Sequence, residues 1–292
     1  MSKGKAQVKY MSRSGLITYA DQPDWGFLYT TNSVPDPEFQ IGDRVVTPDG
    51  RVFRYAKAAG TVLSSFGAAM GDYVTISAVA PAQTTPADPG FPSPGPVQHG
   101  SLGAKTVLIT VASDDGHAGD GVVALDELRG GYIVLANQGS SAQNRGIIGN
   151  TAVASGGGTC VVYLDAPLTA AVVASTTYIE VMPNPYRAMV PGGGKSSSKE
   201  TFLGVPVITT TTGKYFWLQT WGPLWIVPGG GDPNGPGYHV SDRDVYFVGD
   251  GSINGGYTLT TETGYQRAGS IMQADLAGNY SGPPFVMLQV GI

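Results

Sequence analysis

The amino-acid sequence predicts an all-β protein: a sandwich or barrel of many short antiparallel strands with long glycine- and proline-rich loops and an extended N-terminal arm. Two observations predict this class. Short segments in which β-branched and aromatic side chains are frequent follow one another along most of the chain. Turn residues separate these segments, since the 292 residues include 43 glycines and 21 prolines, which interrupt strands and form tight turns.

The composition limits the kinds of partner that the chain can have. Charged residues are only 13% of the chain, against about 25% in typical soluble domains, and the formal net charge is −5. No basic patch crosses the body of the chain, which argues against nucleic-acid binding. No apolar run reaches the ~18 residues of a membrane helix, and the N-terminus lacks the apolar core of a secretory signal. A weakly charged surface fits a protein that is partly covered in an assembly, and it fits a monomer with a serine-, threonine- and glycine-rich surface equally well.

One strand, from Tyr215 to Trp221, is expected to organise the rest of the chain. The side chains expected to share one face are Tyr215, Trp217, Gln219 and Trp221. The side chains between them are also largely apolar, whereas a half-exposed antiparallel strand would show one polar face. The pattern therefore predicts a strand that is central in a sandwich or is covered by another subunit. A turn at 212–214 should precede it, and a break at 222–223 should lead to a returning strand at 224–227.

The remaining elements are expected to be short strands. The clearest hairpin spans residues 41–55, where Pro48-Asp49-Gly50 supplies a proline-first turn. Helical turns are expected at 122–129 and 165–168. Further strands are expected at 72–79, 105–111, 132–136, 146–150, 159–164, 178–182, 244–248, 256–261, 266–272 and 285–290.

Changes in composition along the chain predict a division into segments. Residues 1–40 form the N-terminal arm, and residues 41–190 form a β-rich domain that contains a proline-rich loop at 80–103. A glycine- and serine-rich linker at 191–200 follows. Residues 201–292 are then either a second β-rich domain or the second half of the same sandwich.

The N-terminal arm is a candidate interface. Its first twenty residues carry basic side chains and no acidic ones, in contrast to the acidic body of the chain. Such a segment is either a frayed terminus or an arm that lies on a neighbouring subunit. An aromatic group follows it, and rigid aromatic side chains often contribute most to interface energy. The candidate interface residues are Lys3, Lys5, Lys9, Arg13, Trp25, Phe27 and Tyr29.

No pattern typical of catalysis, cofactor binding or metal binding is present. The glycine run before Lys195 resembles a phosphate-binding loop, but Met189 occupies the position where that motif needs a glycine. The aspartates of the segment 114–121 provide hard oxygen ligands, but their spacing does not fit the helix-loop-helix calcium motif. The histidines His99, His117 and His239 have no metal-ligand spacing to one another or to Cys160, the single cysteine. We therefore expect no enzyme activity, no cofactor and no metal site.

Two segments resemble structural proteins of tailed bacteriophages, in particular capsid decoration (cement) proteins. The first is V-P-V-I-T-T-T-T-G-K-Y-F-W-L-Q-T-W-G-P, in which a turn of small residues leads to Tyr215, Trp217, Gln219 and Gly222. The second is I-G-D-R-V-V-T-P-D-G-R-V-F-R-Y, which precedes the first in the order expected for these proteins. Shorter matches lie between them, so the resemblance covers most of residues 41–292 as scattered short segments.

The resemblance implies a structural protein on the exterior of the virion, made in the cytoplasm of a bacterial host. Its partners would be the assembled major capsid protein and further copies of itself, possibly as a trimer, with no nucleic acid and no membrane. Two alternatives stay open. One is an appendage of the phage head or tail that binds a host receptor or glycan through exposed tryptophan and tyrosine. The other is a hydrolase of envelope polysaccharide, although no acid pair marks such a site.

Overall fold

The computed structural model describes residues 25–71, 76–79, 100–116, 119–137, 141–172, 177–192, 201–229, 243–255, 265–273 and 285–290. In these ranges the chain consists of β-strands, turns and two short 3-10 segments, η2 (Trp25–Tyr29) and η3 (Pro185–Arg187). The predicted all-β class is confirmed, with antiparallel sheets that form a half-barrel and a nearly closed barrel.

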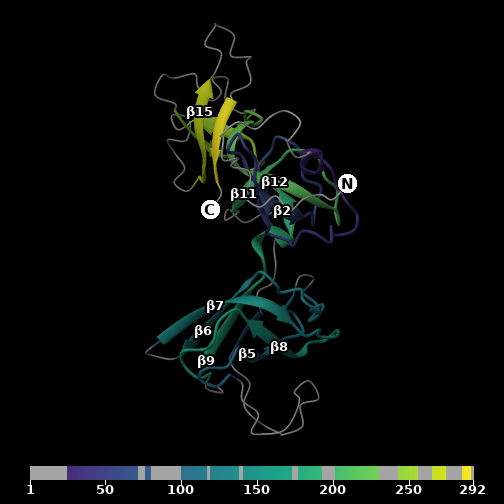
Figure 1. Ribbon diagram of the computed structural model, residues 1–292, viewed down its shortest axis with the longest axis vertical. Helices are drawn as coiled ribbons and strands as arrows, with labels where there is room; N and C mark the ends of the chain where they lie inside the picture. Colours follow the sequence, from purple (N-terminus) through teal and green to yellow (C-terminus); the bar gives the residue numbers. More distant parts are fainter. Residues whose placement is uncertain are drawn as a thin grey trace, which may run out of the picture. The chain divides into compact units, whose positions relative to one another are not determined.

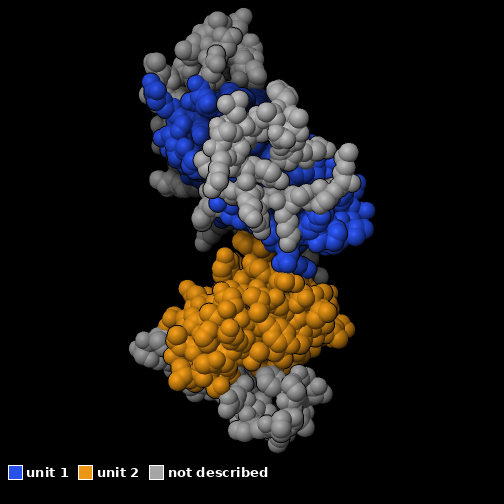
Figure 2. Space-filling view, viewed as in Figure 1, with its two compact units in different colours: residues 1–71, 186–292 blue, residues 72–185 orange. Residues whose placement is uncertain are grey.

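The chain forms two compact units, and the second is inserted into the first (Figure 2). Unit 1 consists of Met1–Gly71 and Tyr186–Ile292, and unit 2 consists of Asp72–Pro185. This division differs from the one that composition predicts, because the segment 41–71 groups with the C-terminal part of the chain and not with residues 72–185. The cause is the pairing of two strands that lie far apart in the sequence, which composition does not reveal. The expected linker at 191–200 lies largely outside the described residues.

The sheet of unit 1 is antiparallel and has ten strands among the described residues. Eight strands follow the order β10-β3-β11-β12-β16-β15-β13-β14, and β2 pairs with both β1 and β12. Figure 1 labels β2, β11, β12 and β15 of this sheet. The strands are β1 (Arg44–Val46), β2 (Val52–Lys57), β3 (Ala68–Met70), β10 (Met189–Pro191), β11 (Phe202–Pro206), β12 (Tyr215–Trp225), β13 (Asp244–Phe247), β14 (Ile253–Gly255), β15 (Arg267–Gln273) and β16 (Phe285–Gln289).

Strand β12 connects the two halves of this sheet. Its first half pairs with β2 and β11, and its second half pairs with β16. The expected break at Gly222 and the separate strand at 224–227 are therefore wrong, since one bent strand continues to Trp225. Gly222 has φ +101° and a register shift lies between Gln219 and Trp221. A glycine in the left-handed region bends the strand without ending it.

Substitution of Gly222 should test this bend. Gly222→Ala is expected to lower the free energy of unfolding by about 2–3 kcal/mol, because alanine is strained at this φ and its Cβ needs the space of a neighbour. An added Cβ would lie 3.0 Å from Cα of Arg51. Gly213→Ala is the matched control, because Gly213 also has positive φ but has nothing within 4 Å. Urea unfolding should show a clearly smaller loss for the control, and equal losses would exclude a special role for the bend.

Unit 2 is a six-stranded antiparallel sheet with the order β4-β9-β6-β7-β8-β5 (Figure 1). The two outermost strands, β4 and β5, also lie near each other, so the sheet nearly closes into a barrel. Branched aliphatic side chains, among them Ile109, Ile133 and Leu164, fill its core together with Cys160. The strands are β4 (Ile76–Val79), β5 (Thr106–Val111), β6 (Tyr132–Asn137), β7 (Ser141–Asn150), β8 (Gly158–Leu164) and β9 (Thr177–Met182).

Most predicted strands and turns within the described residues are confirmed. The hairpin at 41–55 pairs Val45 with Phe53, and Gly50 has φ +85° in its turn. The helical turns expected at 122–129 and 165–168 are wrong, because residues 125–130 form non-helical turns and residues 165–168 form a bend and irregular chain. In the first of these segments Asp126 has φ +58°, and a right-handed helix cannot continue through a residue with positive φ. The strand expected at 256–261 and most of the proline-rich loop at 80–103 lie outside the described residues.

Candidate functional site

The predicted core strand is the centre of an aromatic cluster in unit 1. Trp217 on β12 is 2% exposed, and its ring centroid lies 4.9 Å from that of Phe39 in an edge-to-face arrangement. Phe27 and Tyr55 contact the same indole, with centroids 5.6 and 5.1 Å away. Residues 216–220 are all buried within the single chain, whereas Tyr215 is half-buried and Trp221 is exposed. The strand is thus central in its own sheet, and no second subunit is needed to cover residues 216–220.

Gln219 has a structural role next to the bend. Its side chain is fully buried, and Nε2 donates to the carbonyl oxygens of Trp221 and Pro223 at 3.2 and 3.0 Å. These bonds span the register shift and satisfy two carbonyl groups of the bent strand. Its Oε1 has no hydrogen-bond partner among the described residues.

The aromatic residues proposed for the N-terminal interface divide into two groups. Trp25 and Phe27 pack on the cluster around Trp217, and the ring of Phe27 stacks on Phe39 at 5.6 Å. They therefore fasten the segment η2 to their own unit. Tyr29 is 45% exposed, and its hydroxyl accepts a hydrogen bond from Arg51. The basic residues Lys3, Lys5, Lys9 and Arg13 lie outside the described residues, so their interface role stays a prediction.

The acidic loop around residues 114–121 uses its carboxylates in turns. Asp115 Oδ2 accepts the backbone N–H of Ala112 at 2.7 Å, and Asp120 Oδ1 accepts that of Val122 at 3.1 Å. Within the described ranges, no group of three or more histidine, cysteine, aspartate or glutamate side chains is placed to hold a metal ion. Nor do those ranges contain a helix long and apolar enough to cross a membrane.

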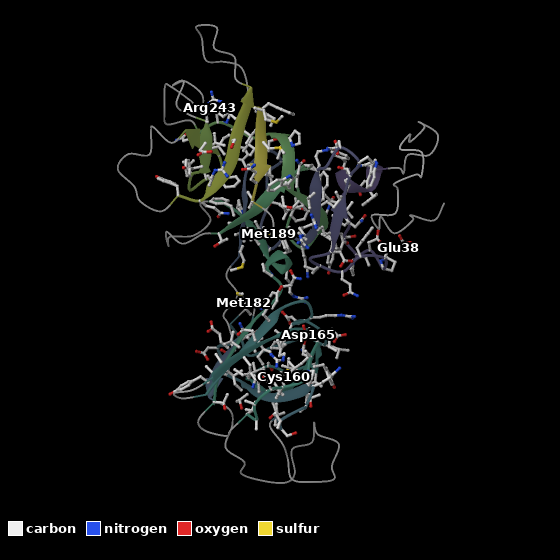
Figure 3. The ribbon with its side chains drawn as sticks, turned by 60° about the vertical axis from the view of Figure 1, so that its left-hand side comes forward. Glu38, Cys160, Asp165, Met182, Met189 and Arg243 are labelled. Carbon is white, nitrogen blue, oxygen red and sulfur yellow. The ribbon has the colours of Figure 1, made fainter. Side chains whose placement is uncertain are left out.

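Cys160 is a buried thiol of the unit 2 core (Figure 3). Its Sγ donates to the carbonyl oxygen of Thr151 at 3.2 Å. Burial, only partly offset by hydrogen bonds, raises the pKa of this thiol to about 11. The reactive thiolate is therefore scarce near neutral pH, which fits a core residue and not a nucleophile.

The outer surface of unit 2 carries exposed aromatic and aliphatic side chains on four strands of the barrel, and we call this surface the tyrosine face. Its members are 40–54% exposed: Tyr132, Ile148, Tyr163, Tyr178 and Met182. Tyr132 on β6 lies directly opposite Met182 on β9, the residue labelled in Figure 3. On β9, exposed residues alternate strictly with buried ones, so the period-two pattern at 177–182 is a sequence signal for this face.

Unit 1 carries a second exposed aromatic patch, which we call the tryptophan face. Its large apolar members are 38–54% exposed: Trp221, Trp225, Met272 and Phe285. They lie on three neighbouring strands, β12, β16 and β15. The sequence pattern does not predict this face, because the break expected at Gly222 ends the strand before Trp225. The available signal was the spacing of Trp221, Pro223 and Trp225, which places all three on one side of a continuous strand.

Comparisons with known proteins identify no relative: no protein-family model, no curated protein and no solved structure matches this chain. The two exposed sheet faces are therefore the observations on which a function can be argued.

Proposed function

We propose that the chain is a structural protein of a bacteriophage virion that decorates and stabilises the assembled capsid. The observation that carries this proposal is the tyrosine face of unit 2. It offers aromatic and methionine side chains on a rigid barrel, and these residue types are enriched at protein interfaces. The sequence resemblance to capsid decoration proteins gives the partner, which would be the major capsid protein.

The charge distribution supports docking on a protein surface. The chain has few charged residues. On the exposed side of β9, the acidic residue is Glu180, which lies between Tyr178 and Met182. An interface made by this surface removes little charge from water, so the desolvation penalty is small. Removal of apolar area contributes roughly 25 cal/mol per Å², partly offset by the freedom lost on docking.

The proposed mechanism needs no catalysis. A protein that binds the assembled lattice and not the free capsid subunits stabilises assembly by mass action. A standard interface buries about 1,600 Å² in total, and even a modest gain becomes large when it is repeated at many equivalent sites. The expected consequence is a shell that resists heat and internal pressure better with the protein than without it.

The test uses phage particles prepared with and without this chain. Heating both while DNA release is monitored should show release at a lower temperature in particles that lack the chain. The double variant Tyr132→Ser/Met182→Ser should give particles with low occupancy, whereas Val34→Ser, at an exposed apolar residue of unit 1, should give full occupancy. Equal release temperatures at full occupancy would contradict stabilisation. A few copies per particle, in place of hundreds, would indicate a head or tail appendage.

A further inference from the structure

The tryptophan face of unit 1 combines an aromatic row with a polar row on one side of the same sheet. Strand pairing places Trp225 opposite Phe285 and Trp221 opposite Gln289. The side chains of β16 alternate, so Phe285 and Gln289 share the outer side while Val286 and Leu288 are buried. The outer side is therefore apolar at one end, where Trp225 lies, and becomes polar toward Gln289.

The polar row is a connected network of hydrogen bonds. Arg267 donates to Gln289 Oε1 at 2.7 Å, to Ser270 Oγ at 2.8 Å and to Asp244 Oδ1 at 2.8 and 3.1 Å. The network joins β13, β15 and β16, next to Arg243, which is labelled in Figure 3. Arg267 is held by several bonds at once, so its guanidinium has little freedom left to lose on binding.

The network remains open to solvent. Arg267 and Asp244 side chains are 44% and 50% exposed. Among the described residues, Asp244 Oδ2 has no hydrogen-bond partner, so one carboxylate oxygen is held in place with its acceptor capacity unused. The ion pair balances the formal charges of Arg267 and Asp244, so the network itself presents donors and acceptors without a net charge, and Arg243 is the exposed charged residue beside it.

We propose that the tryptophan face binds a neutral oligosaccharide or polysaccharide chain. A sugar ring has apolar C–H faces and a polar hydroxyl edge, and the face offers an aromatic row beside a row of fixed donors and acceptors. Indole faces carry negative partial charge that attracts C–H groups, while Asp244, Gln289 and Arg267 match hydroxyl groups. This inference concerns unit 1 and does not depend on the proposed docking of unit 2.

The spacing of the two tryptophans indicates a chain of several sugars and not a single monosaccharide. Trp221 and Trp225 are four residues apart on one strand, which corresponds to at most about 13 Å. Pro223 lies between them on the same side of β12 and pairs with Met287. An apolar protein partner fits this face less well, because it would have to cover the network around Arg267 and remove it from water.

Affinity electrophoresis in gels that contain a defined polysaccharide tests the proposal. The probes are dextran, a β-1,3-glucan, a mannan and a galactan, with alginate as the acidic comparison. We expect at least one neutral polysaccharide to retard the intact chain. Trp221→Ala and Trp225→Ala should each weaken that binding at least about tenfold, and Arg267→Met should weaken it about as much. Tyr132→Ala, which removes an exposed ring of unit 2, should bind like the parent chain.

Folding and partner class are checked in the same series. Each variant should keep the near-ultraviolet circular dichroism of its buried aromatic residues, and sugar should change tryptophan emission in the parent chain. Lack of retardation by every polysaccharide would overturn the proposal, as would binding that both tryptophan variants retain. Loss of particle occupancy in the tryptophan variants, without any sugar binding by the parent, would assign this face to a protein partner and would also overturn it.

Discussion

Trp217→Ala is expected to lower the free energy of unfolding of unit 1 by about 3–5 kcal/mol. The indole is almost fully buried, and the rings of Phe27, Phe39 and Tyr55 surround it. Its removal leaves a cavity at the point where β2, η2 and the loop that carries Phe39 meet β12. Urea unfolding followed by far-ultraviolet circular dichroism, with tryptophan emission as a second probe, measures the loss.

Trp221→Ala is the matched control for this prediction. It removes the same side chain from the same strand, four residues further on, but from a position that is 38% exposed. The loss should be about 1 kcal/mol or less, because little buried area disappears and no closed cavity forms. Similar losses for the two variants would contradict the assignment of Trp217 as the centre of the unit 1 aromatic cluster.

The sequence predicted the parts of the fold that depend on local patterns. Apolar side chains on both faces of residues 216–220 predicted a central strand, because an edge or half-exposed strand would have polar residues on one face. The hairpin around Gly50 was predictable because its turn needs a residue with positive φ. Both features depend on a few neighbouring residues, so their signals are contained in short segments.

The parts that the sequence did not predict depend on contacts between distant segments. The pairing of Tyr55 with Trp217 brings residues 41–71 into the same unit as the C-terminal strands. No local composition signals that pairing, so the division into units was not predicted. The sequence predicts a break at Gly222 because glycine before proline usually ends a strand. In the folded chain its positive φ accommodates a bend, and pairing with β16 continues the strand beyond it.

The candidate surfaces show the same difference between local sequence patterns and contacts between distant segments. Alternation on β9 was visible in the sequence, but only the sheet order brings Met182 beside Tyr132. Trp25 and Phe27, chosen from composition as interface anchors, contribute instead to the cluster around Trp217. Composition therefore identified these aromatic residues as contact residues, but strand pairing decides that their contacts lie within the same chain.

Asn150→Ala is expected to lower the stability of unit 2 by about 3 kcal/mol or more. The Asn150 side chain is fully buried, its Oδ1 accepts the N–H of Leu128 at 2.8 Å, and its Nδ2 donates to Ala124 and Thr151 carbonyl oxygens at 2.9 and 2.8 Å. Alanine leaves the buried N–H of Leu128 without this partner, at about 1–3 kcal/mol, and removes one bond from each of the two carbonyl oxygens, at about 1 kcal/mol each; Glu127 N–H and Cys160 Sγ still donate to those oxygens. The bonds to Leu128 and Ala124 fasten the turns between β5 and β6 to the end of β7, so the whole barrel should open more easily.

Native-state hydrogen exchange measures this effect separately in the two units. Amide protection in β6, β7 and β8 should fall in Asn150→Ala, while protection in β12 of unit 1 should stay unchanged, because opening free energies are local to cooperative segments. Asn144→Ala is the control, since Asn144 lies on the same strand but is exposed to solvent. Unchanged protection in the barrel would show that the network around Asn150 does not hold it together. An equal fall in β12 would show that the inserted unit and its host open as one, because a defect buried in one unit would then destabilise the other.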